Sequence, residues 1–517
     1  MLAYVAIGVA VAGLALPVVG YARKLWRIHR QSLPYTAAPS VFLEYVDATL
    51  YLVREVLNVG RSVQECFWDG FRYQCVVARR MGSFVTQVLH ECSVVLVDRE
   101  MSRRLLADTV NLRKGFVYDL LDRWLADGLL TGGRGGGERW RKMRRLVNPV
   151  FHRGTLNRHN ATIIAQAERF ARSLAAARGG DEVDVRLCTA PLTLAILFRS
   201  VLGVDVSDVG NDRIDEYVRA VHTLTVLFTE RSIKPHYWFR PIYGWTSSGR
   251  LEARALAQIN GFVDAMVERR RAALAAQPDL AGDALMDTLI IEHARRPADV
   301  TVEDIRNEVN TFMFAGHDTS SVALSFTLFV VASMPDIQQR ILDEVLTAVG
   351  VGGGDSGSPA HSGGTPGALP EDCLPQLKYT EAVVKECLRL FPPVPLIARK
   401  LEHDLDLGKG PISAGTNVVV AISALHMDPQ LFPRPDEFQP ERFLSADNVP
   451  GFMPFSAGPR SCIGQRLALN ELVLTTATVV KNCVLQARGY RDEIIVAMEI
   501  VLRSKKPLTV AVKARSY

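Results

Sequence analysis

The spacing of hydrophobic positions changes along the chain and divides it into segments. Over residues 46–345, apolar residues recur three and four positions apart in long stretches rich in Leu, Ala and Arg, which predicts α-helices. A helix is expected over 379–390, ended by two prolines, and another from just after residue 462 to about 482. Short β-branched runs such as 417–421, bounded by Gly and Pro, predict strands. We therefore predict a mainly α-helical chain with a minor β subdomain, an α+β fold.

The most continuous apolar run lies at the N-terminus. Residues 2–22 contain no charged side chain. As a helix such a run spans roughly 30 Å, the thickness of a bilayer core. Basic residues follow directly and favour the cytoplasmic side of a membrane. A cleaved signal peptide is the alternative, but the run is long for one and lacks a positive N-terminal region. We expect a membrane anchor at 1–22 and a basic linker at 23–45.

No linker divides the remainder of the chain, so we interpret residues 46–517 as one large domain. Within it, residues 350–370 are of low complexity and predict a flexible surface insertion. Hydrophobic residues make up 48% of the 517 residues, enough for a large core. The net charge of +5 gives no reason to expect nucleic-acid binding. The cysteines show no spacing typical of zinc sites or a disulfide framework.

A loop near the C-terminus has the composition of a thiolate ligand site. From Phe455 it reads FSAGPRSCIG, which places the cysteine at Cys462. Gly458 and Gly464 would let the loop turn tightly, so that backbone amides point at the sulfur. The helix that follows adds its positive end and lowers the thiol pKa. Phe455 can shield the sulfur, and Arg460 can meet an anionic group. A purely structural cysteine, the alternative, would need none of these features.

A second candidate lies in the long apolar run that contains the sequence AGHDT from Ala315. Glycine inside a helix costs about 1 kcal/mol relative to alanine, so Gly316 indicates that another group approaches the backbone closely. Thr311, Ala315 and Thr319 are four residues apart and share one helix face. Thr319 can hydrogen-bond bound oxygen, and Asp318 can relay protons from solvent. The alternative is a core helix with back-bonding hydroxyls.

These two segments resemble those of the cytochrome P-450 superfamily. The loop matches the family's haem-binding pattern F-x-x-G-x-R-x-C-x-G at every position, and the helix is similar to its distal oxygen-binding helix. The resemblance implies a cytochrome P-450 fold and haem b, with Cys462 as the proximal iron ligand. It implies a monooxygenase that inserts one oxygen atom of O₂ into a C–H bond. Electrons would come from NADPH through a flavoprotein reductase, with cytochrome b5 as a further partner.

The same resemblance implies partners for the haem propionates. Trp140 and Arg144 match the family's W-x-x-x-R pair, and Arg399 and Arg460 are the other expected contacts. The remaining basic residues of the W-x-x-x-R helix form either a solvated face or a docking surface for an acidic reductase: Arg141, Lys142 and Arg145.

Two further motifs are far apart in the sequence. Glu386 and Arg389 form an E-x-x-R pair on a predicted helix, and Arg442 belongs to a P-E-R-F segment. As residues three apart, the first two are also compatible with an ordinary surface pair. The resemblance implies instead a buried network of all three residues that supports the core behind the haem.

The expected substrate class comes from a closer resemblance of two segments to one branch of the family. Residues 127–156 and the aromatic segment 231–246 are similar to the microsomal fatty-acid ω-hydroxylases. We expect a protein of the endoplasmic reticulum membrane that faces the cytosol and oxidises a lipophilic substrate, first a long-chain fatty acid. Many relatives carry a glutamate that bonds covalently to haem where Ala315 stands, so covalent attachment is not expected. The Ala315 form is shared with sterol-hydroxylating branches, which keeps a sterol or other isoprenoid as the alternative.

Two other functions remain open at this point. One is a haem-thiolate enzyme that rearranges peroxides without a reductase, but such enzymes often alter the acid–alcohol pair that Asp318 and Thr319 retain. The other is a haem-binding sensor without catalysis, against which the complete proton relay counts.

Overall fold

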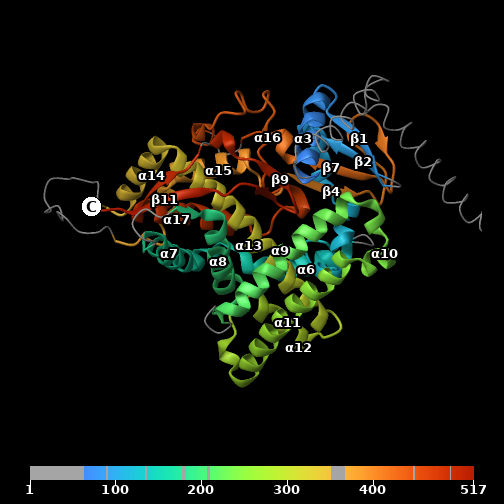
Figure 1. The fold of residues 1–517 in the computed structure, drawn as a ribbon. Coiled ribbons are helices and arrows are strands. Elements are labelled where there is room, and N and C mark those ends of the chain that lie inside the picture. The colour runs from blue at the N-terminus through green and yellow to red at the C-terminus, as the bar shows by residue number, and fades with distance from the viewer. Residues whose placement is uncertain are drawn as a thin grey trace, which may run out of the picture.

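The computed structural model describes most of the predicted large domain. The described residues are 63–88, 91–133, 137–176, 182–205, 210–350, 367–445, 449–489 and 491–517. The expected membrane anchor at 1–22, the basic linker at 23–45 and residues 351–366 of the expected insertion lie outside them. Figure 1 shows a helical body with a small sheet and α3 at one end and the C-terminus at the other.

Helices make up most of this body, as the apolar periodicity predicts. Their bounds are α3 (Val63–Ala78), α4 (Arg99–Ala107), α5 (Asp122–Leu125), α6 (Glu138–Val147), α7 (Arg153–Ala176), α8 (Val185–Leu197), α9 (Asn211–Ile233), α10 (Arg240–Trp245), α11 (Ser247–Ala276), α12 (Leu285–Arg295), α13 (Val302–Ser333), α14 (Pro335–Ala348), α15 (Lys378–Leu390), α16 (Ile422–His426) and α17 (Gln465–Asn482).

The strands form small sheets. The largest has the order β1-β2-β7-β4, made of β1 (Ser83–Val88), β2 (Glu91–Leu96), β7 (Asn417–Ala421) and β4 (Leu396–Lys400). A second has the order β3-β11-β8, made of β3 (Glu182–Asp184), β11 (Thr509–Ala514) and β8 (Cys483–Ala487). Two hairpins complete the set: β5 (Leu405–Asp406) with β6 (Pro411–Ile412), and β9 (Val496–Met498) with β10 (Leu502–Ser504).

The central helix α13 organises the core. It begins with a capping box, in which Thr301 and Asp304 satisfy each other's backbone amides. It packs along α8, and the two helices come close at Gly316, where a Cβ atom would lie 2.6 Å from Cδ1 of Leu197. The close approach expected from a glycine in mid-helix is therefore to a neighbouring helix, on a stretch that also borders the main cavity.

The predicted balance of helix and strand is confirmed, but one part of the helical prediction was wrong. β1 and β2 lie inside the stretch 46–345, where only helices were expected. β2 pairs in parallel with β7, and Val94 lies opposite Val418, more than three hundred residues away. Such a long-range pairing decides the local conformation, and spacing within one segment does not reveal it. The expected strand at 417–421 and the helix that follows Cys462 are present.

Among the described residues, the stretch Val185–Leu202 is long and apolar enough to cross a membrane, and 61% of it is buried inside the protein. The bent pair Val302–Ser333 and Pro335–Ala348 passes the same test only as a whole, with a bend of 107°. Both belong to the core, and neither corresponds to the anchor expected at 1–22.

A buried carboxyl group on α13 makes the stability of the fold depend on pH. Glu308 is buried, and burial raises its pKa to about 8, while its side chain accepts a hydrogen bond from the amide of Leu129 at 3.1 Å. In an unfolded chain the pKa of a glutamate is about 4.3. Between these values the folded protein holds a proton that the unfolded chain has released, so stability falls as pH rises through this window.

We expect Glu308→Gln to flatten the fall in melting temperature between about pH 5 and pH 8, because glutamine stays neutral and still accepts the amide. Each pKa unit of difference corresponds to about 1.4 kcal/mol, so the change in slope is measurable by calorimetry. Glu303→Gln, an exposed change on the first turn of the same helix, is the matched control. A Glu308→Gln variant with the wild-type slope would contradict the assignment.

Candidate active site

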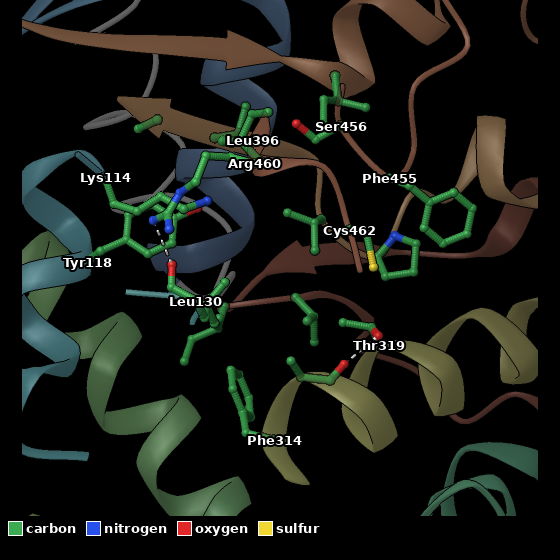
Figure 2. Close-up of a pocket in the computed structure, with 18 of the residues that line it drawn as sticks. Lys114, Tyr118, Leu130, Phe314, Thr319, Leu396, Phe455, Ser456, Arg460 and Cys462 are labelled. Atoms are coloured by element: carbon green, nitrogen blue, oxygen red, sulfur yellow. Dashed lines mark hydrogen bonds between the residues drawn. The ribbon is translucent and has the colours of Figure 1, made fainter. Parts of the chain in front are cut away.

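In the described part of the chain, a cavity of about 740 Å³ lies between α13 and the loop that precedes α17. Its wall is mainly apolar and includes parts of α3, β1, β2 and the turn between β9 and β10. Figure 2 shows Cys462 and Thr319 on facing walls, with Lys114, Tyr118 and Arg460 grouped to one side. The two segments singled out in the sequence are therefore brought together at one space.

The loop around Cys462 is held by backbone contacts. The Cys462 amide donates to the carbonyl of Phe455 at 2.9 Å, and the Phe455 ring lies at the same cavity. Gly458 has φ +69°, and a Cβ atom there would lie 1.9 Å from the carbonyl oxygen of Leu106. Only glycine fits this position. Gly464 lies in the turn that leads into α17, but with φ −87° its backbone does not require glycine, so the left-handed conformation is confined to Gly458.

The Cys462 side chain is accessible because it faces the cavity, while protein atoms otherwise surround the thiol. Burial raises the pKa of the Cys462 thiol, and the Gly464 amide and the charges of Arg144 and Lys114 oppose that shift. Burial therefore opposes the thiolate form that the sequence argument requires. A metal ion bound at the sulfur would deprotonate it.

Buried positive charge gathers at one side of the cavity. Lys114 and Arg460 line the space, and Arg399 is buried behind them, joined to Lys114 through a β-bridge. Burial lowers the pKa of Arg460 to about 9 and that of Arg399 to about 10. In the described part of the chain, Nη1 of Arg399 and Nε of Arg460 have no hydrogen-bond partner. Buried, unsatisfied cations of this kind fit an anionic ligand.

Trp140 and Arg144 of α6 also line the cavity. The guanidinium of Arg460 lies 4.4 Å from the centre of the Trp140 ring, and Arg460 donates to the carbonyl of Gly132 at 2.6 Å. The Trp140 indole N–H donates to the carbonyl of Leu129 at 3.0 Å. This donor is therefore occupied by backbone, and the ring stacks on Arg460. The contact of Trp140 with a propionate stays a prediction.

The facing wall is built by α13. Thr311, Ala315, Gly316 and Thr319 all line the cavity, as their spacing predicts. The Thr319 hydroxyl donates to the carbonyl of Ala315 at 2.8 Å, which leaves its oxygen lone pairs available as acceptors. Asp318 does not line the cavity. Its Oδ1 forms an ion pair with Arg503.

A model of the cytochrome P-450 family matches residues 56–512. The chain belongs to this family. Similar proteins include cytochrome P-450 4V2 of Rattus norvegicus, 30% identical over 522 residues that cover 96% of this chain and 92% of the relative. Cytochrome P-450 4c3 of Drosophila melanogaster is 31% identical over 447 residues, 82% and 80% of the two chains. Cytochrome P-450 4ae1 of the same organism is 33% identical over 456 residues, 85% and 87%.

The family predicted from the loop and the helix is thus confirmed, and with it the fold and the enzyme class. P-450 enzymes are monooxygenases that use haem b and receive electrons from NADPH through a reductase. Membership of this family makes the chain a monooxygenase, and the non-catalytic haem-binding sensor is therefore excluded. The residues present fit a haem: a cavity-facing thiol stands on one wall, apolar side chains border the space, and unsatisfied arginines are placed for carboxylates.

The E-x-x-R and P-E-R-F motifs of this P-450 meet in the core, away from the cavity. Glu386 and Arg389 are both 0% exposed and form two hydrogen bonds of 2.7 and 2.8 Å. Nε of Arg442 lies 3.4 Å from Oε1 of Glu386. Arg389 also donates to the carbonyls of His426 and Glu437 at 2.9 and 3.1 Å. The surface pair considered for these residues is therefore wrong, because both charges are buried.

Two cavity residues were not predicted from the sequence. Lys114 is brought to the site by its bridge to Arg399, a contact that only the folded chain reveals. Glu471 lies on α17, buried at the cavity with Oε1 lacking a partner in the described residues. Burial raises its pKa to about 8, and Ser320 hydrogen-bonds its carboxyl group. An acid inside the apolar run of α17 was the one sequence feature that pointed to it.

Proposed function

We propose that this P-450 inserts one oxygen atom of O₂ into a C–H bond of a long-chain fatty acid. The observation that carries the proposal is the placement of Cys462 and the face Ala315–Thr319 on opposite walls of one apolar cavity. Cys462 is the proximal ligand of the haem iron. Glu386, Arg389 and Arg442 support the core behind it.

The haem propionates are held by the buried positive cluster. Arg399 and Arg460 offer unsatisfied donors, and Lys114 and Arg144 add positive charge near them. Trp140 acts by stacking on Arg460 rather than through its N–H group. Phe455, Gly458 and Gly464 shape the loop beside the sulfur. Ala315 has no group that can bond to the porphyrin, so the haem is attached non-covalently.

Bound haem supplies the activation of O₂, to which a thiolate ligand contributes electron density. The chain contributes hydroxyl and carboxyl groups that hold or pass protons near the haem. Gly316 keeps the α13 wall free of a side chain, and Thr319 presents a hydroxyl oxygen to the cavity. Asp318, the residue before Thr319, is the acid that passes protons toward the cavity. Glu471, neutral below about pH 8, is a second carboxyl at the same wall.

The proposed substrate and location rest on three features. The cavity is mainly apolar and includes aromatic side chains such as Phe116, Phe228 and Trp238. The segment 1–22 anchors the protein in the endoplasmic reticulum membrane, with the domain 46–517 in the cytosol, so a lipid can enter from the bilayer. The resemblance to fatty-acid ω-hydroxylases favours a fatty acid. The alanine at 315, shared with sterol-hydroxylating branches, supports a sterol as the second candidate.

The electron donor is a flavoprotein reductase, with cytochrome b5 as a further partner. The α6 residues Arg141, Lys142 and Arg145 are positively charged and offer a docking surface for an acidic protein. Lys142 and Arg145 are exposed, and Lys142 lies 3.8 Å from Glu138, a loose surface contact. This leaves positive charge at the surface for a partner.

The substrate proposal is tested with the full chain in lipid bilayers, together with reductase and NADPH. We expect long-chain fatty acids to shift the haem spectrum toward high spin and to yield a hydroxylated acid, identified by mass spectrometry. Product from cholesterol but from no fatty acid would replace the fatty acid by the sterol alternative. Product from neither would refute the lipid substrate and leave the family assignment intact.

A further inference from the structure

The hairpin β9–β10 contacts both the cavity and Asp318 on α13. Its turn contributes Met498, Glu499, Ile500 and Val501 to the cavity wall, where they contact whatever fills the space. Two residues beyond the turn, Arg503 on β10 reaches Asp318 on α13. The β9–β10 hairpin therefore contacts both the cavity and the acid Asp318.

Arg503 joins two buried carboxylates. Its Nη2 atom pairs with Oδ1 of Asp318, and its Nε atom lies 3.1 Å from Oε2 of Glu499, an ion pair in which these two atoms do not have hydrogen-bond geometry. The side chains of Asp318 and Glu499 are 6% and 9% exposed, whereas that of Arg503 is 23% exposed. One guanidinium thus lies against carboxylates from two different elements, α13 and the β9–β10 turn. Lys505 adds a looser contact to Glu499, at 3.6 Å.

The second oxygen of Asp318 has a different environment. Oδ2 is buried and has no hydrogen-bond partner among the described residues. Leaving such an atom unsatisfied costs roughly 1–3 kcal/mol, so it is a favourable place for a proton-bearing group such as a water molecule. The titratable groups around Asp318 are the neighbouring His317, Tyr217 across from it, and Arg503. The ion pair with Arg503 fixes which way Oδ2 points.

We propose that Arg503 is a positioning residue that couples the substrate-contacting turn 499–501 to proton delivery by Asp318. This rests on the proposed proton-relay role of Asp318. A substrate that fits the turn keeps Glu499 and Arg503 in place, and Asp318 then directs Oδ2 toward the proton path. When the turn is displaced, Arg503 no longer holds Asp318, and proton delivery slows.

The consequence is a choice between two balanced reactions. With proton delivery intact, substrate RH, O₂, NADPH and H⁺ give ROH, H₂O and NADP⁺. When delivery is slow, O₂, NADPH and H⁺ give H₂O₂ and NADP⁺, and the substrate is left unchanged. The fit of a substrate at the turn thus determines how much of the NADPH is used for hydroxylation.

The test compares Arg503→Gln and Arg503→Lys with Lys506→Gln, a control that removes a positive charge from an exposed position just after the same hairpin. The full chain with reductase in bilayers is assayed with the lipid that wild type oxidises. We expect Arg503→Gln to lower the product formed per NADPH about tenfold and to raise the solvent deuterium isotope effect, since positioned acids contribute factors of this order or more. Arg503→Lys keeps the charge, and its product per NADPH is expected to lie between the values for wild type and Arg503→Gln.

A double-mutant cycle decides whether Arg503 acts through Asp318. In an Asp318→Asn background, Arg503→Gln is expected to have no further effect on product per NADPH. The proposal would be overturned if the effects of the two substitutions on product per NADPH added, or if Arg503→Gln formed as much product per NADPH as wild type. If wild type oxidises no lipid, the substrate proposal fails, and Arg503 is tested separately with a compound that shifts the haem spectrum of wild type and is oxidised by it. Equal product per NADPH in wild type and Arg503→Gln with that compound would overturn the proposal.

Discussion

Replacement of Cys462 by alanine is expected to remove the strongly red-shifted Soret band from the ferrous carbon-monoxide difference spectrum and to abolish turnover. The cavity-facing thiol is the described group at this wall that can act as a thiolate ligand, and alanine offers no lone pair in its place. The substitution removes one sulfur atom and leaves the backbone bond from the residue 462 amide to Phe455 intact. The fold is therefore expected to survive, while haem content falls to a small fraction of wild type.

The matched control is Cys188→Ala. Cys188 is a half-buried cysteine on α8 whose thiol contacts the carbonyl of Asp184, and it does not line the cavity. We expect this variant to keep the wild-type spectrum. A red-shifted band that persists in Cys462→Ala, or a histidine-like band in wild type, would contradict the ligand assignment.

The second large effect is expected at the buried ion pair of α15. Arg389→Ala leaves the fully buried Glu386 carboxylate without its main partner, and it also removes the donors to His426 and Glu437. Breaking a buried pair by removing one partner costs about 3–5 kcal/mol, because the remaining charge is uncompensated. We expect a marked fall in melting temperature and loss of haem during purification.

The same helix offers a control pair. Lys385 lies 2.6 Å from Glu381, but these side chains are partly exposed, 23% and 41% respectively. Exposed pairs of this kind contribute about 0–1 kcal/mol, so Lys385→Ala should leave the melting temperature nearly unchanged. Thermal unfolding of both variants in parallel measures the difference. Equal stability of Arg389→Ala and Lys385→Ala would show that Arg389 does not support the core.

The parts of the site that are local in sequence were predictable from it. The Cys462 loop requires glycine at 458, because a side chain would overlap the Leu106 carbonyl oxygen, and that need is visible as a motif of fixed spacing. The positions Thr311, Ala315 and Thr319 face one space because helix geometry places residues four apart on one side. The helix after Cys462 and the strand 417–421 were identified for the same reason, since their patterns repeat within a few residues.

Other features depend on residues that meet only after folding. The hairpin of β1 and β2 contains short runs of Val, Thr and Phe that are typical of strands, and its parallel pairing with the distant β7 is visible only in the folded chain. Lys114 reaches the buried positive cluster through its bridge to Arg399. Asp318 was predicted from the sequence to relay protons, but its ion pair with Arg503 follows from how β10 lies against α13.

The sequence by itself determined the family, the helical character and the residues of the two facing cavity walls, because each of these is encoded in short segments with fixed spacing. The tertiary structure decided which charges are buried together, which donors are already used, and which turn connects the substrate space to the acid at 318. These depend on desolvation and on contacts between distant segments, and both arise only when the chain is packed.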